Sequence, residues 1–84
     1  MGRTLTQQLG QCIRDLRLGR GLSQVEFGEQ CGFYQTYLSR IENGQANPTV
    51  NALEVIANAF GLTVFDLFDR VREMETAGDA AEPM

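Results

Sequence analysis

The sequence predicts an all-α domain, a bundle of five helices over residues 5–19, 24–31, 35–43, 49–60 and 64–76. Three observations support this fold class. No run of alternating β-branched and aromatic residues continues past four positions, so strands are not expected. Apolar residues recur instead at the i, i+3, i+4 and i+7 spacing of a helix face. Residues typical of helix starts and stops separate these segments.

The first helices are marked by an apolar stripe and a capping motif. The stripe of the first helix consists of Leu9, Ile13 and Leu16. In the segment LSQVEF, Ser23 and Glu26 have the spacing of a capping box, in which each side chain bonds the backbone N–H of the other residue. Gly32 and Gly44, which accept a positive φ, end the second and third helices.

The last two helices begin with similar signals. In ANPT, either Asn47 or Thr49 can cap the fourth helix, and Pro48 suits its first turn. Thr63 and Asp66 repeat the capping-box spacing at the start of the fifth helix.

Length and composition indicate one domain over residues 1–76, followed by an acidic tail over residues 77–84 that we expect to be disordered. Hydrophobic residues make up 43% of the chain and charged residues 21%, as in ordinary globular proteins. No apolar run approaches the ~20 residues that span a bilayer, so we expect no membrane partner and a cytoplasmic location.

The sequence shows no recognisable catalytic or metal site. It contains no His, the commonest general base, and no Lys. Its cysteines, Cys12 and Cys31, lie nineteen positions apart, whereas a zinc site needs about four nitrogen or sulfur ligands. We therefore expect both cysteines to act as small hydrophobic residues, and we expect no metal, no cofactor and no enzymatic activity.

The net charge of −4 argues at first against a nucleic-acid partner, but its distribution does not. Residues 1–62 carry five arginines and five acidic residues and are therefore neutral. The remaining residues carry two arginines and six acidic residues, so the acidity belongs to the C-terminal segment.

Residues 24–43 have the spacing of two short helices that cross steeply. Gly28 leaves room for the third helix to approach the second, and Gly32 allows a tight turn between them. The apolar residues expected to point inward and join the pair are Phe27, Cys31, Phe33, Leu38 and Ile41. This spacing predicts a helix-turn-helix.

The segment LSQVEFGEQCGFYQTYLSRIENGQANPT resembles helix-turn-helix proteins of the Cro/phage-repressor type, the XRE family. The resemblance covers about Leu5 to Phe68, and its matching positions are Gln24, Gly28, Gly32, Leu38, Ile41, Glu42, Gly44 and Pro48. It implies a lambda-repressor-like five-helix bundle that binds double-stranded operator DNA as a homodimer, with the third helix in the major groove.

The resemblance implies DNA contacts for Gln24, Tyr34, Gln35, Thr36, Tyr37, Ser39, Arg40 and Asn43. The residues assigned to base reading, because Gln suits adenine and Arg suits guanine, are Gln35, Thr36 and Arg40, helped by Ser39. Gln24 is expected to contact a phosphate from the start of the second helix. The remaining residues are expected to contact the DNA backbone.

Three of these assignments have structural alternatives. Arg40 could instead pair with Glu29 or another carboxylate, and Tyr34 and Tyr37 could pack on the bundle. Tyr34 replaces the Ser that usually caps the third helix in this family, which costs about 1 kcal/mol unless packing or a DNA phosphate compensates.

Two further groups are assigned to structural roles. The resemblance implies a partly buried ion pair between Arg17 and Glu42, which ties the first helix to the end of the third. Phe65, Val71 and Met74 on the fifth helix are expected to form the homodimer interface, because they lie beyond what the motif bundle needs to bury.

These observations predict a transcriptional regulator that binds a palindromic operator and regulates its own gene, as a restriction–modification controller protein does. A phage-type repressor and an antitoxin with a toxin partner are alternatives within that class. A protein-interaction module that has kept the fold but lost DNA binding is an alternative from another class.

Overall fold

The computed structural model describes the backbone of residues 2–81 and the side chains of residues 2–74. Five helices follow one another: α1 (Leu5–Gly19), α2 (Gln24–Cys31), α3 (Gln35–Glu42), α4 (Val50–Ala59) and α5 (Val64–Ala81). No strand occurs within residues 2–81, so the predicted all-α class is confirmed. The predicted helix boundaries agree within one residue, except at the end of α5.

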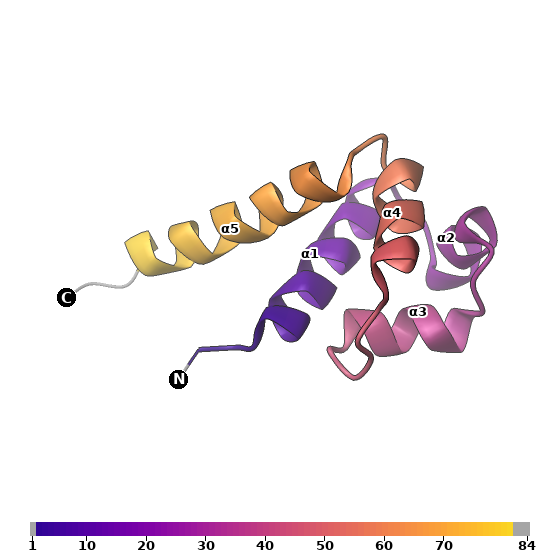
Figure 1. Cartoon of the computed structure of the whole chain (residues 1–84), viewed down its shortest axis with the longest axis horizontal. Coiled ribbons are helices and arrows are strands. Elements are labelled where there is room, and N and C mark those ends of the chain that lie inside the picture. Colours follow the sequence, from indigo (N-terminus) through magenta and orange to yellow (C-terminus); the bar gives the residue numbers. More distant parts are fainter. Residues whose placement is uncertain (1, 82–84) are drawn as a thin grey trace.

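The helices are arranged around α1 (Figure 1). Helix α1 packs against both α3 and α5, α2 packs against α3 and α4, and α4 packs against α5. The α2–α3 pair is the predicted helix-turn-helix and lies at one end of the molecule, whereas the C-terminal part of α5 projects from the other end. This arrangement leaves one side of α3 open to solvent.

Two glycines allow α3 to approach its neighbours closely. A Cβ atom at Gly28 would lie 2.9 Å from the carbonyl oxygen of Phe33, so the predicted need for a small residue is confirmed, although the close neighbour is the turn before α3 and not α3 itself. A Cβ atom at Gly10 would collide with the carbonyl oxygen of Ile41 and lie 2.7 Å from that of Glu42. Gly10 therefore sets the distance between α1 and the end of α3, a constraint that the sequence analysis missed.

The hydrophobic core joins all five helices. Its largest fully buried side chains are Phe27, Ile13, Leu38, Ile41, Ile56 and Leu67. The Phe27 and Phe60 rings stack with centroids 4.5 Å apart, which connects α2 to the end of α4. Because α3 contributes Leu38 and Ile41 to this core, the rotation of α3 about its own axis is fixed.

The capping motifs have the local geometry that their spacing predicts. Ser23 and Glu26 form a capping box, with both bonds between 2.8 and 3.0 Å, and Thr63 and Asp66 form another. Of the two alternatives for α4, Thr49 is the cap. Pro48 precedes this cap and does not lie in the first turn, which corrects the prediction for that residue.

The last helix is longer than predicted. It continues to Ala81, because the residues that follow Thr76 are mostly small or good helix formers and the next proline in the chain is Pro83. Residues 77–81 of the predicted disordered tail are thus helical, and the rest of that tail lies outside the described residues. Within the described residues no single helix is both long and apolar enough to cross a membrane; α4 and α5 meet that test only as a pair bent by 84°.

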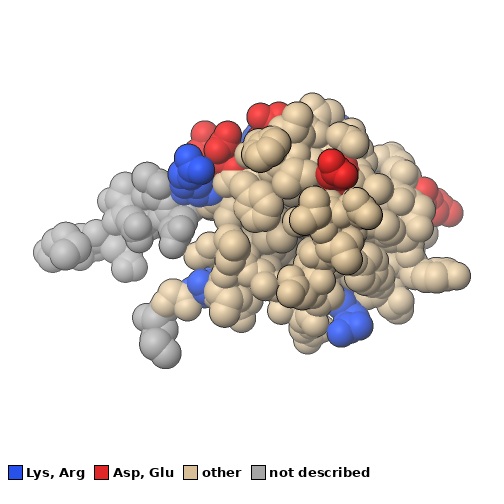
Figure 2. Space-filling model, viewed as in Figure 1, with Lys and Arg blue, Asp and Glu red and all other residues tan. Residues whose placement is uncertain are grey.

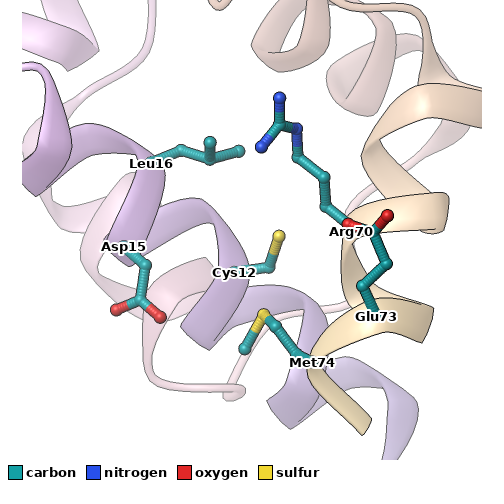
Figure 3. Close-up of a pocket in the computed structure, with 6 residues that line it drawn as sticks. All are labelled: Cys12, Asp15, Leu16, Arg70, Glu73 and Met74. Carbon is teal, nitrogen blue, oxygen red and sulfur yellow. The ribbon is translucent and has the colours of Figure 1, made fainter. Parts of the chain in front are cut away.

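The face of α5 toward α1 changes the predicted dimer interface. Val71 is 3% exposed and belongs to the core of the monomer, so it does not fit a subunit contact. Met74 packs against the core and lines a cavity between α1 and α5 together with Cys12 (Figure 3). Helix α5 packs against α1, and Met74 is half-buried there, so Val71 alone is removed from the predicted contact surface. Phe65, at 83% exposed, is the most exposed member of the predicted set, and the half-buried Met74 stays a predicted contact residue.

Charge is unevenly distributed over the face shown in Figure 2. In the view of Figure 2, acidic residues lie over the upper and right-hand parts of the surface, with basic residues beside some of them, and the charged groups visible along the mostly uncharged lower edge are basic. In Figure 1 that lower edge is formed by α3 and by the start of α1. On the face shown, the charged groups visible at the edge formed by α3 are therefore basic.

Candidate nucleic-acid interface

The outward side of α3 carries the polar residues predicted to meet DNA. Gln35, Thr36, Arg40 and Asn43 are exposed, and Ser39 is half-buried. Burial of Leu38 and Ile41 on the other side of the helix directs these residues outward. These five of the eight predicted residues thus lie on one surface, which we call the α3 face.

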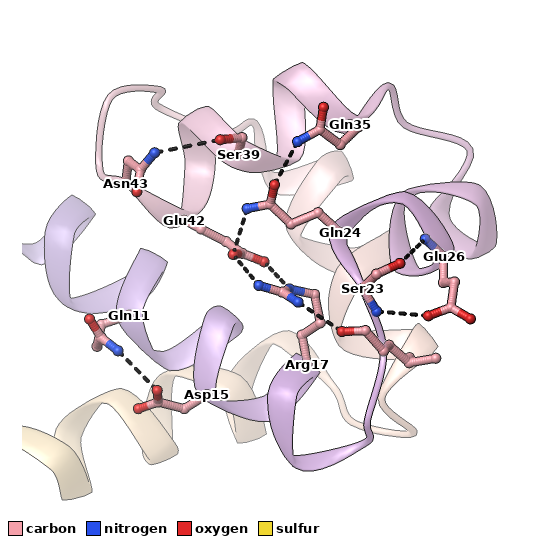
Figure 4. A network of polar contacts seen from close by, with 11 residues as sticks. Gln11, Asp15, Arg17, Ser23, Gln24, Glu26, Gln35, Ser39, Glu42 and Asn43 are labelled. Carbon is pink, nitrogen blue, oxygen red and sulfur yellow. Dashed lines mark hydrogen bonds and ion pairs between the residues drawn. The ribbon is translucent and has the colours of Figure 1, made fainter.

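A buried ion pair holds α3 against α1 (Figure 4). Arg17 donates from Nε to Glu42 Oε2 (2.7 Å) and from Nη2 to Glu42 Oε1 (3.0 Å), and both residues are 6% exposed. A third donor of Arg17, Nη1, bonds the carbonyl oxygen of Leu22 at 2.7 Å. The hydrogen bonds to Glu42 raise the pKa of Arg17 above its ordinary value, so the guanidinium keeps its charge at neutral pH.

The same network extends to the surface through two glutamines. Gln24 Nε2 donates to Glu42 Oε1 at 3.0 Å, and Gln24 Oε1 accepts from Gln35 Nε2 at 2.6 Å (Figure 4). The buried carboxylate therefore fixes which way the amide of Gln24 points, and Gln24 in turn orients Gln35. This link is not predictable from the sequence, because the two residues are eleven positions apart and either amide suits solvent equally well.

Three other contacts bear on the alternatives left open by the sequence. Arg40 donates to the carbonyl oxygen of Gln45 at 3.3 Å. Among the described side chains Arg40 forms no ion pair, so the alternative pairing with Glu29 is not found. The ring of Tyr37 packs edge-on against Phe33 with centroids 5.2 Å apart, which favours packing on the bundle for that residue. Asn43 donates to Ser39 Oγ at 3.5 Å.

The start of α3 is open. Tyr34 occupies the N-cap position without a side-chain hydrogen bond and is 85% exposed, so the missing cap predicted from the sequence is confirmed. The first backbone N–H groups of α3 thus have no side-chain cap, and they lie beside the exposed α3 face.

The described part of the chain shows no competing chemical site. Among its His, Cys, Asp and Glu residues, no group of three could hold a metal ion. Burial raises the pKa of the Cys12 thiol, which therefore stays neutral at pH 7. An exposed polar face on the second helix of a helix-turn-helix, held in place by a buried network, defines a DNA-binding protein of the helix-turn-helix class.

Comparison with known proteins places the chain within that class. Residues 8–67 match the family model described as a helix-turn-helix domain, and the chain belongs to this family. It is 36% identical over 61 residues to the control protein C.BamHI of Bacillus amyloliquefaciens, covering 71% of this chain and 75% of that protein. The XRE-type regulator predicted from the sequence is confirmed, and these regulators are not enzymes.

Two further proteins extend the comparison. The immunity repressor of Bacillus phage phi105 is 38% identical over 56 residues, which cover 67% of this chain but 39% of the repressor, so the likeness concerns a part of that protein. The structure of the restriction–modification controller protein C.AhdI from Aeromonas hydrophila has a TM-score of 0.69 and 30% identity, and the match covers 75% of this chain and 94% of that one.

Proposed function

We propose that this DNA-binding regulator acts as a homodimer on a palindromic operator and regulates its own gene. The observation that carries the proposal is the α3 face, whose polar groups are exposed while the buried network behind them fixes their position. Rigid support of this kind lowers the entropy that the side chains lose when they bind DNA. The site therefore suits a binding partner of fixed geometry, such as the major groove of DNA.

Individual residues of the α3 face have distinct proposed roles. Arg40 carries two parallel donors that match O6 and N7 of guanine, and Gln35 can pair with adenine through its amide. Thr36 and Ser39 supply hydroxyls to bases or phosphates. Gln24 has two proposed roles. Its side-chain carbonyl accepts from Gln35 and so orients that residue, and the amide N–H that does not bond Glu42 is offered to a phosphate.

Contacts to the DNA backbone complete the proposed interface. Asn43 stands at the end of α3, where its amide can reach a phosphate. Tyr34 stands at the uncapped start of the helix, where a phosphate would bond the free backbone N–H groups. Tyr37 contributes through the part of its side chain that packing on Phe33 leaves accessible.

A homodimer is proposed because one helix reads too few base pairs to define an operator. The proposed contact surface is centred on Phe65, whose 83% exposure is unusual for so large an apolar ring, and includes the half-buried Phe68 one turn along α5. A two-fold axis there would present two α3 helices to successive turns of the major groove, about 34 Å apart.

Autoregulation is proposed from the likeness to control and controller proteins. A phage-type repressor is the second candidate, favoured by the likeness to the phi105 immunity repressor. Neither role needs a toxin partner, and none is proposed. Either regulator would act in the cytoplasm of a bacterial cell, where its operator and the nucleoid lie.

The test is selection of binding sites by the intact protein from a random DNA library, followed by footprinting on the DNA upstream of its own gene. We expect an enriched palindrome with half-sites one helical turn apart, and protection of the same sequence upstream of the gene. Enrichment of unrelated sequences would overturn operator binding. A palindrome absent from the upstream DNA would overturn autoregulation alone.

A further inference from the structure

The N-terminal arm, residues 2–4, is fixed against the first turn of α1. Thr4 and Gln7 form a capping box, in which the Thr4 N–H donates to Gln7 Oε1 at 2.9 Å and the Gln7 N–H donates to Thr4 Oγ1 at 3.1 Å. The carbonyl oxygen of Arg3 accepts from Gln8 Nε2 at 3.3 Å. These bonds hold the backbone of the arm and leave the side chain of Arg3 exposed.

The fixed arm lies at the edge of the α3 face. A Cβ atom at Gly44 would lie 3.0 Å from Gln7 Cα, so the turn that follows α3 touches the first turn of α1. Gly10, one turn further along α1, meets the last carbonyl groups of α3. The start of α1 and α3 accordingly share the lower edge in Figure 1, where the charged groups visible in Figure 2 are basic.

The proposed interface has few cations of its own. Arg40 is the arginine of α3, and the following loop, residues 43–49, contains no basic residue. Neutralisation of phosphates by cations supplies most of the sequence-independent affinity for DNA. A second arginine at this edge would therefore change the affinity and the salt dependence of binding measurably.

We propose that Arg3 binds a phosphate of the DNA backbone next to the base pairs contacted by α3. The inference rests on the proposed function of the α3 face and adds a contact from a separate element. Its anchored backbone limits where the guanidinium can go, and a guanidinium matches the oxygens of a phosphate. The contact is independent of sequence, because a phosphate is present at every step of the duplex.

The test compares Arg3→Gln with Arg72→Gln, which removes the same charge from an exposed residue on α5 that pairs with Asp69 at 3.7 Å. Binding of each intact variant to a random-sequence duplex is measured between 50 and 200 mM salt. Each phosphate contact makes the slope of log affinity against log salt steeper by about 0.9. If Arg3 makes one such contact, the fourfold rise in salt should weaken wild-type binding by a factor about 3.5 times larger than the factor for Arg3→Gln. Arg72→Gln should keep the wild-type slope.

An Arg3→Gln slope equal to that of wild type would overturn the proposal. So would a loss confined to one DNA sequence, since that would place Arg3 on a base. Arg40→Ala, measured in parallel for base preference, separates the two proposals: if Arg40→Ala alters preference while Arg3→Gln changes nothing, the arm contact fails and the α3 face stands. If neither variant changes binding, both fail. An unchanged melting temperature of Arg3→Gln shows that folding is not the cause.

Discussion

Replacement of Glu42 by alanine tests the buried network that supports α3. The substitution leaves Arg17, which is 6% exposed, with two N–H donors and a positive charge unpaired, and it removes the acceptor of Gln24 Nε2. Breaking a buried ion pair from one side costs about 3–5 kcal/mol, because the remaining charge is stranded away from water. For a domain of this size that corresponds to a fall of about 12–40 °C in melting temperature.

The assay is urea unfolding followed by circular dichroism, which gives the free energy of unfolding of each variant. Glu54→Ala is the matched control, because it removes a carboxylate from an exposed position on α4 and should change that free energy by less than about 0.5 kcal/mol. The double variant Arg17→Met with Glu42→Leu should recover most of the loss, since no unpaired charge remains. A single Glu42→Ala variant within about 1 kcal/mol of wild type would refute the reasoning.

Three further predictions concern binding, assembly and pH. Gln24→Ala should weaken binding to all DNA sequences and also relax the base preference at the position read by Gln35; binding equal to wild type on both measures would exclude Gln24 from the interface. Phe65→Asp should remain folded but raise the dimer dissociation constant at least tenfold in sedimentation experiments; a dimer as stable as wild type would move the interface elsewhere. Backbone hydrogen bonds from the cap residues lower the pKa values of Glu26 and Asp66 below their ordinary 4.5 and 3.8. The two ionised carboxylates therefore stabilise the fold above these ordinary pKa values, and this stabilisation is lost as the pH falls through the lower pKa values of the folded state. Thermal unfolding between pH 7 and pH 2 should show that loss, and it should be smaller in Glu26→Gln; an equal loss in that variant would contradict the assignment.

Features that depend on near neighbours in sequence were predictable. Capping boxes need two residues three positions apart, so the sequence determines Ser23–Glu26 and Thr63–Asp66 directly. The need for a small residue at Gly28 follows from the short turn after it. The equivalent capping box of Thr4 and Gln7 carried the same local signal and was overlooked.

Features that depend on how helices meet were less predictable. Val71 looks unpartnered when α5 is read alone, yet it is buried in the monomer, and Met74 is half-buried beside α1; the sequence does not state the angle between two helices. The bond between Gln24 and Gln35 arises only when α2 and α3 cross. Gly10 had one sequence signal, an isolated glycine inside a helix, but its partner on α3 becomes known only from the structure.

The central claim is that the α3 face reads DNA sequence, and the base preference of Arg40→Ala tests it most directly. Binding-site selection with wild type and with this variant should give the same operator, except for one base pair in each half-site whose preference for guanine is lost. Specific binding should weaken by about 1–3 kcal/mol for each such pair, with binding to random DNA nearly unchanged. Equal losses on specific and random DNA, with the preference intact at every position, would contradict the claim.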